Sequence, residues 1–195
     1  MKKILIIILF FNLNFPSSYS IEPDVFVQST VNRASQILAK NISKEEKIDG
    51  LKIVAKETVD INGIGFYSLG SARKDLNDDQ KKIYFDLFED YFLKSFSSRL
   101  SEYTNPKIEV KSKKVINKNY TIVNSVLVST SERPEVKIDW RVYTRDPNNP
   151  LIRDLIIEGL SLARTQKEEF GSILNSNDGD INALFKSLIN FAKNY

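Results

Sequence analysis

The chain has 195 residues, of which 42% are hydrophobic and 27% charged, a balance typical of a globular domain rather than a disordered segment. It contains neither cysteine nor histidine. That composition excludes disulfides, thiolate zinc sites, cysteine nucleophiles and the Ser-His-Asp triad, and it removes nearly every transition-metal site. The net charge is only +3, so the strongly basic surface of a nucleic-acid-binding protein is not expected.

Residues 1–20 have the three parts of a secretory signal peptide. Two lysines stand near the start, an unbroken run of eight apolar residues follows, and the small residues Ser18 and Ser20 precede the expected cut. The apolar run is too short to span a bilayer, which disfavours the alternatives of a membrane anchor or a buried N-terminal helix. The sequence therefore predicts an exported protein with one domain over 21–195.

Apolar residues at helical spacing predict two helices in the first part of this domain, over 24–40 and about 44–67. A third helix has a strong start signal. Asn77 is a capping residue, Gln80 stands at the capping-box position, and two acids occupy the first turn. This helix is expected to end near Tyr103.

The hydrophobic period then changes to that of β-strands. Four segments rich in Val, Ile, Thr and Tyr are expected to form antiparallel strands: 107–116, 120–130, 135–145 and 151–157. After Gly159 the helical pattern returns with Ser161 as its cap, and a last helix covers about 179–193. Three helices, four strands and two more helices predict an α+β domain.

The helix that begins after Asn77 is unusually aromatic. Its apolar residues form two stripes about 100° apart: Phe85, Phe88, Phe92 and Phe96, and Tyr84, Leu87 and Tyr91. A helix on the surface needs only one apolar face, so this one is expected to be covered on most sides or to line a cavity. Burial in an ordinary core explains the pattern without a ligand. The functional alternative is an apolar hollow between this helix and a sheet that curves around it.

Three acids in the strand region are the candidates for acid–base chemistry. Asp139 lies on the polar phase of its strand and is expected to be exposed to solvent, and Glu158 precedes a helix start, where negative charge is favoured. Asp154 lies in an apolar strand and is the acid to test for burial. Because no nucleophile or base has an identifiable partner, no catalytic residue is predicted.

Four parts of the chain carry a resemblance to a known family. Residues 69–85 contain Leu-Gly, Asp-Gln and Phe at the entry to the long helix, and 92–103 (FLKSFSSRLSEY) continue it. The string RDLIIEGLSL at 153–162 is the most specific part, and 170–174 follow at the matching spacing. On these residues the chain resembles the MlaC family, also called the toluene-tolerance auxiliary family, whose members are periplasmic phospholipid carriers of Gram-negative bacteria.

The resemblance implies a single lipid-carrier domain over 21–195, with a curved four-stranded antiparallel sheet packed against long helices in an NTF2-like arrangement. An apolar cavity between sheet and helices is expected to hold phospholipid as cargo, with no other cofactor and no metal. A hopanoid-like lipid stays open as an alternative cargo. The lining is expected from the aromatic helix and the inward strand residues: Tyr84, Phe88, Tyr91, Phe92, Phe96, Val123, Leu127, Ile138, Trp140, Val142 and Ile156.

The resemblance also implies a location and partners. A periplasmic monomer is expected to shuttle lipid between an outer-membrane lipoprotein complex and an inner-membrane MCE-domain protein of an ABC transporter, which maintains the lipid asymmetry of the outer membrane. Two alternatives remain at this point. One is a small exported enzyme on a similar curved-sheet scaffold, and the other is a non-catalytic envelope adaptor with a filled core.

Overall fold

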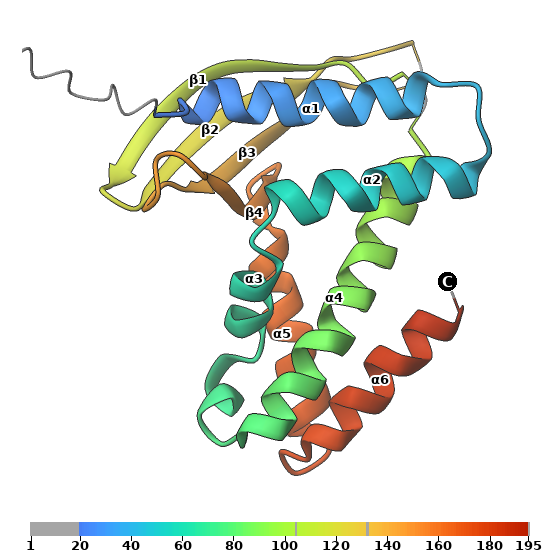
Figure 1. The fold of residues 1–195 in the computed structure, drawn as a ribbon, viewed down its shortest axis with the longest axis vertical. Coiled ribbons are helices and arrows are strands. Elements are labelled where there is room, and N and C mark those ends of the chain that lie inside the picture. Colours follow the sequence, from blue (N-terminus) through green and yellow to red (C-terminus); the bar gives the residue numbers. More distant parts are fainter. Residues whose placement is uncertain (1–19, 104, 132, 195) are drawn as a thin grey trace, which may run out of the picture.

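The computed structural model describes residues 20–103, 105–131 and 133–194 (Figure 1). Except for Ser20, the predicted signal peptide lies outside the described residues. The helices are α1 (Pro23–Ala39), α2 (Lys44–Thr58), α3 (Ile61–Ser68), α4 (Asp78–Ser101), α5 (Leu162–Asn175) and α6 (Ile181–Asn194), with a 3₁₀ turn η1 (Gly70–Lys74). The strands are β1 (Ile108–Asn117), β2 (Tyr120–Leu127), β3 (Val136–Tyr143), β4 (Leu151–Ile157) and β5 (Leu160–Ser161).

The strands form one antiparallel sheet in the order β1-β2-β3-β4-β5, so each strand pairs with its neighbour in sequence. Helix α1 lies along the sheet, and α2 packs against α1 (Figure 1). Helix α4 leads away from α2, with α3 and α5 on one side and α6 on the other (Figure 1). The predicted α+β class is confirmed. The two-residue strand β5 was not predicted, because two residues are too few to show a period.

Burial alternates along the central strands. In β2 the side chains of Val123 and Leu127 are buried, and in β3 those of Ile138, Trp140 and Val142 are buried. The predicted inward face of the third strand is therefore confirmed. The polar groups on this face are satisfied, because Trp140 Nε1 donates to the Ser125 hydroxyl at 2.8 Å and that hydroxyl donates to a backbone carbonyl. A satisfied hydroxyl avoids the cost of burying an unpaired polar group.

The second predicted helix, 44–67, is two helices. The chain leaves the first at Val59, which forms an isolated parallel bridge with Ile152 of β4. The Asp60 N–H donates to the Ile152 carbonyl at 2.9 Å, and the Asp60 carboxylate caps α3 by accepting from the Gly63 N–H. Helical periodicity continues through the break, because its cause is a contact with a strand about ninety residues later.

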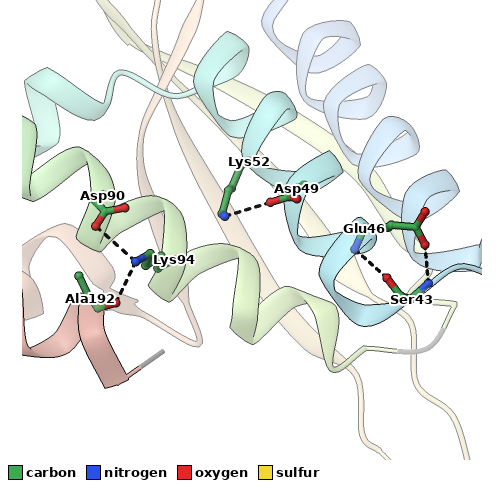
Figure 2. A network of polar contacts seen from close by, with 7 residues as sticks. All are labelled: Ser43, Glu46, Asp49, Lys52, Asp90, Lys94 and Ala192. Atoms are coloured by element: carbon green, nitrogen blue, oxygen red, sulfur yellow. Dashed lines mark hydrogen bonds and ion pairs between the residues drawn. The ribbon is translucent and has the colours of Figure 1, made fainter.

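Two helices begin at the capping residues that the sequence predicts. Asn77 and Gln80 form the predicted capping box of α4, with both side-chain to backbone bonds present. Ser161 caps α5 as predicted, by accepting from the Arg164 N–H. Ser43 and Glu46 form a second capping box at α2 (Figure 2). Such caps satisfy backbone donors that have no partner within the helix.

Helix α4 is covered on more than one side, as its two stripes predicted. Tyr84 and Phe88 are fully buried against the α3 and α5 side, where the Tyr84 hydroxyl donates to the Gly65 carbonyl at 2.9 Å. Leu93 is buried on another side of the helix, because it follows Phe88 by five residues, which correspond to a rotation of about 140°. Burial raises the pKa of Tyr84, with a smaller contribution from Tyr91, so the hydroxyl stays a donor.

The last turn of helix α6 is attached to helix α4. Lys94 Nζ donates to the Ala192 carbonyl at 2.8 Å and forms an ion pair with Asp90 (Figure 2). The rings of Tyr91 and Phe191 meet with centroids 4.6 Å apart. The two long helices therefore pack as one unit. Within the residues that the structure describes, no helix is both long and apolar enough to cross a membrane.

The close approach of α3 to α4 predicts a cost for any side chain at Gly65. A Cβ placed there would lie 2.7 Å from a Phe88 ring carbon, so Gly65→Ala is expected to lower the free energy of unfolding by about 1–3 kcal/mol. Urea denaturation followed by circular dichroism measures this. The matched control is Gly171→Ala in α5, where nothing lies within 4 Å of the new Cβ, and which is expected to be neutral or stabilising by up to about 1 kcal/mol. Equal stability of both variants would contradict the packing described.

Candidate functional site

The interior holds two apolar cavities. The first, the α4–α5 cavity, encloses about 160 Å³ between α4, α5 and strands β3 and β4. Its lining is mainly aromatic and aliphatic, with six polar or charged residues: Val59, Ile64, Phe88, Tyr91, Phe92, Ser95, Phe96, Arg99, Trp140, Ile152, Asp154, Leu155, Leu162, Ala163, Thr165, Gln166 and Glu169. Phe92 of α4 and Trp140 of β3 both line it.

The second, the α1–α2 cavity, encloses about 140 Å³ between α1, α2, the sheet and the end of α4. Its lining is almost wholly aliphatic and aromatic: Thr30, Val31, Ala34, Ser35, Leu38, Leu51, Val54, Ala55, Thr58, Val59, Phe96, Leu100, Tyr103, Pro106, Ile108, Leu127, Ile138, Trp140, Ile152, Leu155 and Ile157. The hydroxyls of Thr30, Ser35 and Thr58 donate to the carbonyls of Phe26, Pro106 and Val54. The surface of this cavity is therefore close to hydrocarbon in character.

The two cavities share a wall. The side chains that line both are Val59, Phe96, Trp140, Ile152 and Leu155. They come from the α2–α3 break, helix α4 and the middle of strands β3 and β4. The cavities therefore adjoin along these five side chains.

A β-bulge in β4 aims the shared wall inward. Trp140 pairs with Leu155 and Val142 pairs with Ile152, so Arg153 is the extra residue between two regular stretches of the ladder. Ile152 and Leu155 consequently line the cavities although they are three residues apart, which a regular strand would not permit. On α4, the rings of Phe92 and Phe96 stack one turn apart with centroids 5.6 Å from each other.

The structure brings seven of the eleven predicted lining residues to the cavities. Phe88, Tyr91 and Phe92 line the α4–α5 cavity, and Leu127 and Ile138 line the α1–α2 cavity. The remaining two, Phe96 and Trp140, line both.

Four predicted residues lie elsewhere. Tyr84, Val123 and Val142 are fully buried in the core but line neither cavity. Ile156 pairs with Asp139, on the opposite face of β4 from Leu155.

Several lining residues were not among those predicted. The apolar stripes of the first two helices, including Val31, Leu38, Leu51 and Val54, line the α1–α2 cavity. Their helical periodicity was visible in the sequence and shows that they are buried, but periodicity does not distinguish a filled core from a cavity. Leu155 has no distinguishing signal, because it begins a run of three apolar residues, Leu155 to Ile157, in which the sequence does not show which side chains point inward.

The rim of the α4–α5 cavity is polar and connects the two helices. The Tyr91 hydroxyl of α4 donates to Gln166 Oε1 of α5 at 2.7 Å, and Gln166 Nε2 donates to the Glu169 carboxylate at 3.1 Å. Arg99, in the last turn of α4, is exposed at the same rim. Apart from the buried Asp154, the polar residues of the lining are partly or fully exposed, and the buried ones are apolar.

The acids of the strand region have structural partners. Asp154 is buried, and its carboxylate accepts from the Ser161 hydroxyl at 2.6 Å and from the Ala163 N–H at 3.0 Å. Asp139, expected to be exposed, is half-buried and accepts from Asn124 at 2.8 Å. The Glu158 carboxylate accepts from the Lys137 N–H. Among the described residues, no group of three or more carboxylates is placed to hold a metal ion.

Comparison with known proteins decides the family. Residues 28–190 match the sequence model of the family described as MlaC protein. The chain belongs to the MlaC family. The resemblance predicted from the sequence is thereby confirmed, and the match covers most of the predicted domain of this MlaC-family chain.

A solved structure shares the fold of this MlaC-family chain. It is a phospholipid-binding protein from Ralstonia solanacearum, in complex with a phospholipid, with 17% sequence identity and a TM-score of 0.76. The match covers 89% of this chain and 98% of that one. At this identity the likeness establishes the fold.

The contacts of Asp154 predict a structural role at the junction of β4 and α5. Asp154→Ala removes the acceptor for a buried N–H and a half-buried hydroxyl, so the free energy of unfolding is expected to fall by about 1–3 kcal/mol. Chemical denaturation measures it, with the exposed Glu168→Ala of α5 as control, expected within about 0.5 kcal/mol of the unchanged protein. An Asp154→Ala protein of full stability would show that the carboxylate does not hold the junction.

Proposed function

We propose that this chain is a periplasmic phospholipid carrier, in which the two adjoining cavities hold the acyl chains and the exposed polar lining residues face the headgroup. The observation that carries the proposal is the shared wall, which includes Phe96, Trp140 and Leu155 and places two apolar cavities side by side. Membership of the MlaC family and the phospholipid in the related structure from Ralstonia solanacearum support the same cargo. The unfilled volume disfavours an adaptor with a solid core.

Elementary energetics suit a carrier. Each buried methylene contributes about 0.8 kcal/mol, so a phospholipid with roughly thirty of them gains on the order of 20 kcal/mol on leaving water for an apolar cavity. Transfer from a membrane to the cavity gains about nothing, because the tails are apolar in both places. The protein can therefore shield a lipid in transit without an energy source, and the direction of transport has to come from its partners or from concentration.

The finer features of the proposal follow from the family. The signal peptide at 1–20 would deliver the chain to the periplasm as a monomer. There it would move phospholipid between an outer-membrane lipoprotein complex and an inner-membrane MCE-domain protein of an ABC transporter, and so maintain outer-membrane asymmetry. Seven side chains are proposed to contact the tails: Phe88, Tyr91, Phe92, Phe96, Leu127, Ile138 and Trp140. Tyr84, Val123 and Val142 would support them from the core.

The direct test is to identify the cargo. Protein purified from a Gram-negative host is expected to carry phospholipid, detected by solvent extraction and mass spectrometry, and delipidated protein is expected to take phospholipid up from vesicles. Protein that is free of lipid after purification, and that takes up none from vesicles, would overturn the proposal.

Two neighbouring residues on β4 give a sharper test of the site. Leu155 lines both cavities, whereas Ile156 is on the opposite face of the strand. Leu155→Trp is expected to fill the junction and reduce bound phospholipid severalfold, while Ile156→Trp is expected to retain it. Lipid content per mole of folded protein is measured by phosphate assay. Equal loading of the two variants would place the lipid outside these cavities.

A further inference from the structure

Helix α4 ends where the two cavities adjoin. Phe96 lines both cavities, and Leu100, one turn later, lines the α1–α2 cavity. Arg99 lines the α4–α5 cavity. It lies three residues after Phe96, on the same face of the helix. A group bound at Arg99 is therefore close to the side chain that divides the interior.

Arg99 has the properties of an unused anion-binding group. Among the residues that line either cavity it is the one cationic side chain, whereas the two acids, Asp154 and Glu169, both line the α4–α5 cavity. Within the described part of the chain its guanidinium makes no hydrogen bond, ion pair or ring contact. Guanidinium groups bind phosphate oxygens in pairs, through two parallel N–H donors.

The chain has seven other arginines. Four have partners: Arg33 with Glu57, Arg153 with Asp60, Arg73 over the Phe66 ring and Arg133 over the Tyr103 ring. Arg141 is exposed on the outward phase of β3 and lines neither cavity. Arg145 and Arg164 line neither cavity either, so it is position that sets Arg99 apart from the other arginines without a partner among the described residues.

The charges on the rim favour one place for an anion. Glu169 of α5 would repel a phosphate, and its carboxylate already accepts from Gln166. Arg99 of α4 would attract one. Two acyl chains of one lipid, placed one in each cavity, would separate at the wall that the cavities share. The glycerol that joins the two chains would then lie beside Phe96, which lines both cavities.

We propose that Arg99 binds the phosphate of a diacyl glycerophospholipid whose two acyl chains lie one in each cavity, on either side of Phe96. This inference rests on the proposed lipid-carrier function and adds a headgroup contact and a stoichiometry of one chain per cavity.

The phosphate contact is tested with two fluorescent lipids that have the same acyl chains, a phosphatidylglycerol and the corresponding diacylglycerol, which lacks the phosphate. Release from loaded protein to acceptor vesicles is timed for the unchanged protein, Arg99→Gln, Arg99→Lys and the control Arg141→Gln. Arg99→Gln is expected to release phosphatidylglycerol about three to ten times faster, as for one exposed charged hydrogen-bonding pair. Its release of diacylglycerol is expected to be unchanged.

Two further measurements complete the phosphate test. Arg99→Lys is expected to give an intermediate rate, because it keeps the charge but loses the paired donors, and the effect of Arg99→Gln is expected to shrink in 1 M NaCl. Equal acceleration for both lipids, or rates for Arg99→Gln equal to those for Arg141→Gln, would overturn the phosphate contact. Failure of the unchanged protein to load either lipid would instead overturn the proposed function.

The stoichiometry is tested by filling one cavity. Ala34 lines the α1–α2 cavity and not the α4–α5 cavity. Ala34→Phe is therefore expected to shift the bound cargo from diacyl to monoacyl phospholipid when both are offered in vesicles. Mass spectrometry of the extracted lipid measures the ratio. An unchanged diacyl fraction, or loss of both lipids from folded protein, would show that the chains do not occupy one cavity each.

Discussion

Strand β4 holds polar contacts on both sides of a bulge, and these contacts attach the helical half of the molecule to the sheet. Before the bulge, the Ile152 carbonyl accepts from the Asp60 N–H, and Arg153, the bulged residue itself, forms an ion pair with the Asp60 carboxylate at 2.5 Å. After it, Asp154 accepts from Ser161 and Ala163 at the start of α5. Because these contacts hold β4 in place on both sides of the bulge, the space between β4 and α4 can stay open without side chains that fill it.

An unfilled apolar interior is costly in a protein of this size. A closed cavity in a core destabilises by about 24 cal/mol per Å³. The two cavities of about 160 and 140 Å³, which are open in part to solvent, therefore correspond to at most several kcal/mol. That amount is a large part of the stability of an ordinary domain. The polar attachments of β4 and the packing of α6 on α4 therefore offset a loss that the interior imposes, and apolar cargo would remove it. Ligand binding and folding are coupled through the same volume.

The parts of the fold that were predicted from the sequence depend on local chemistry. The capping box of Asn77 and Gln80 and the cap at Ser161 involve residues a few positions apart, and the alternation of β3 follows from the pleat alone. The break at Val59 and the bulge at Arg153 depend on each other across the fold, and neither is encoded near its own position. For that reason the inward turn of Leu155 could not be predicted, and the volume enclosed behind a periodic apolar face could not be predicted either.

The hydroxyls along the α1–α2 cavity have a consequence for what can be distinguished inside it. Thr30, Ser35 and Thr58 each donate to a main-chain carbonyl, so a guest meets little besides methyl and methylene groups. Such a surface has no means of recognising a double bond or a branch by its chemistry, so it selects guests only by whether their bulk fits the cavity. In a carrier of the proposed kind, acyl chains of similar bulk would therefore be bound in proportion to their abundance in the bilayer.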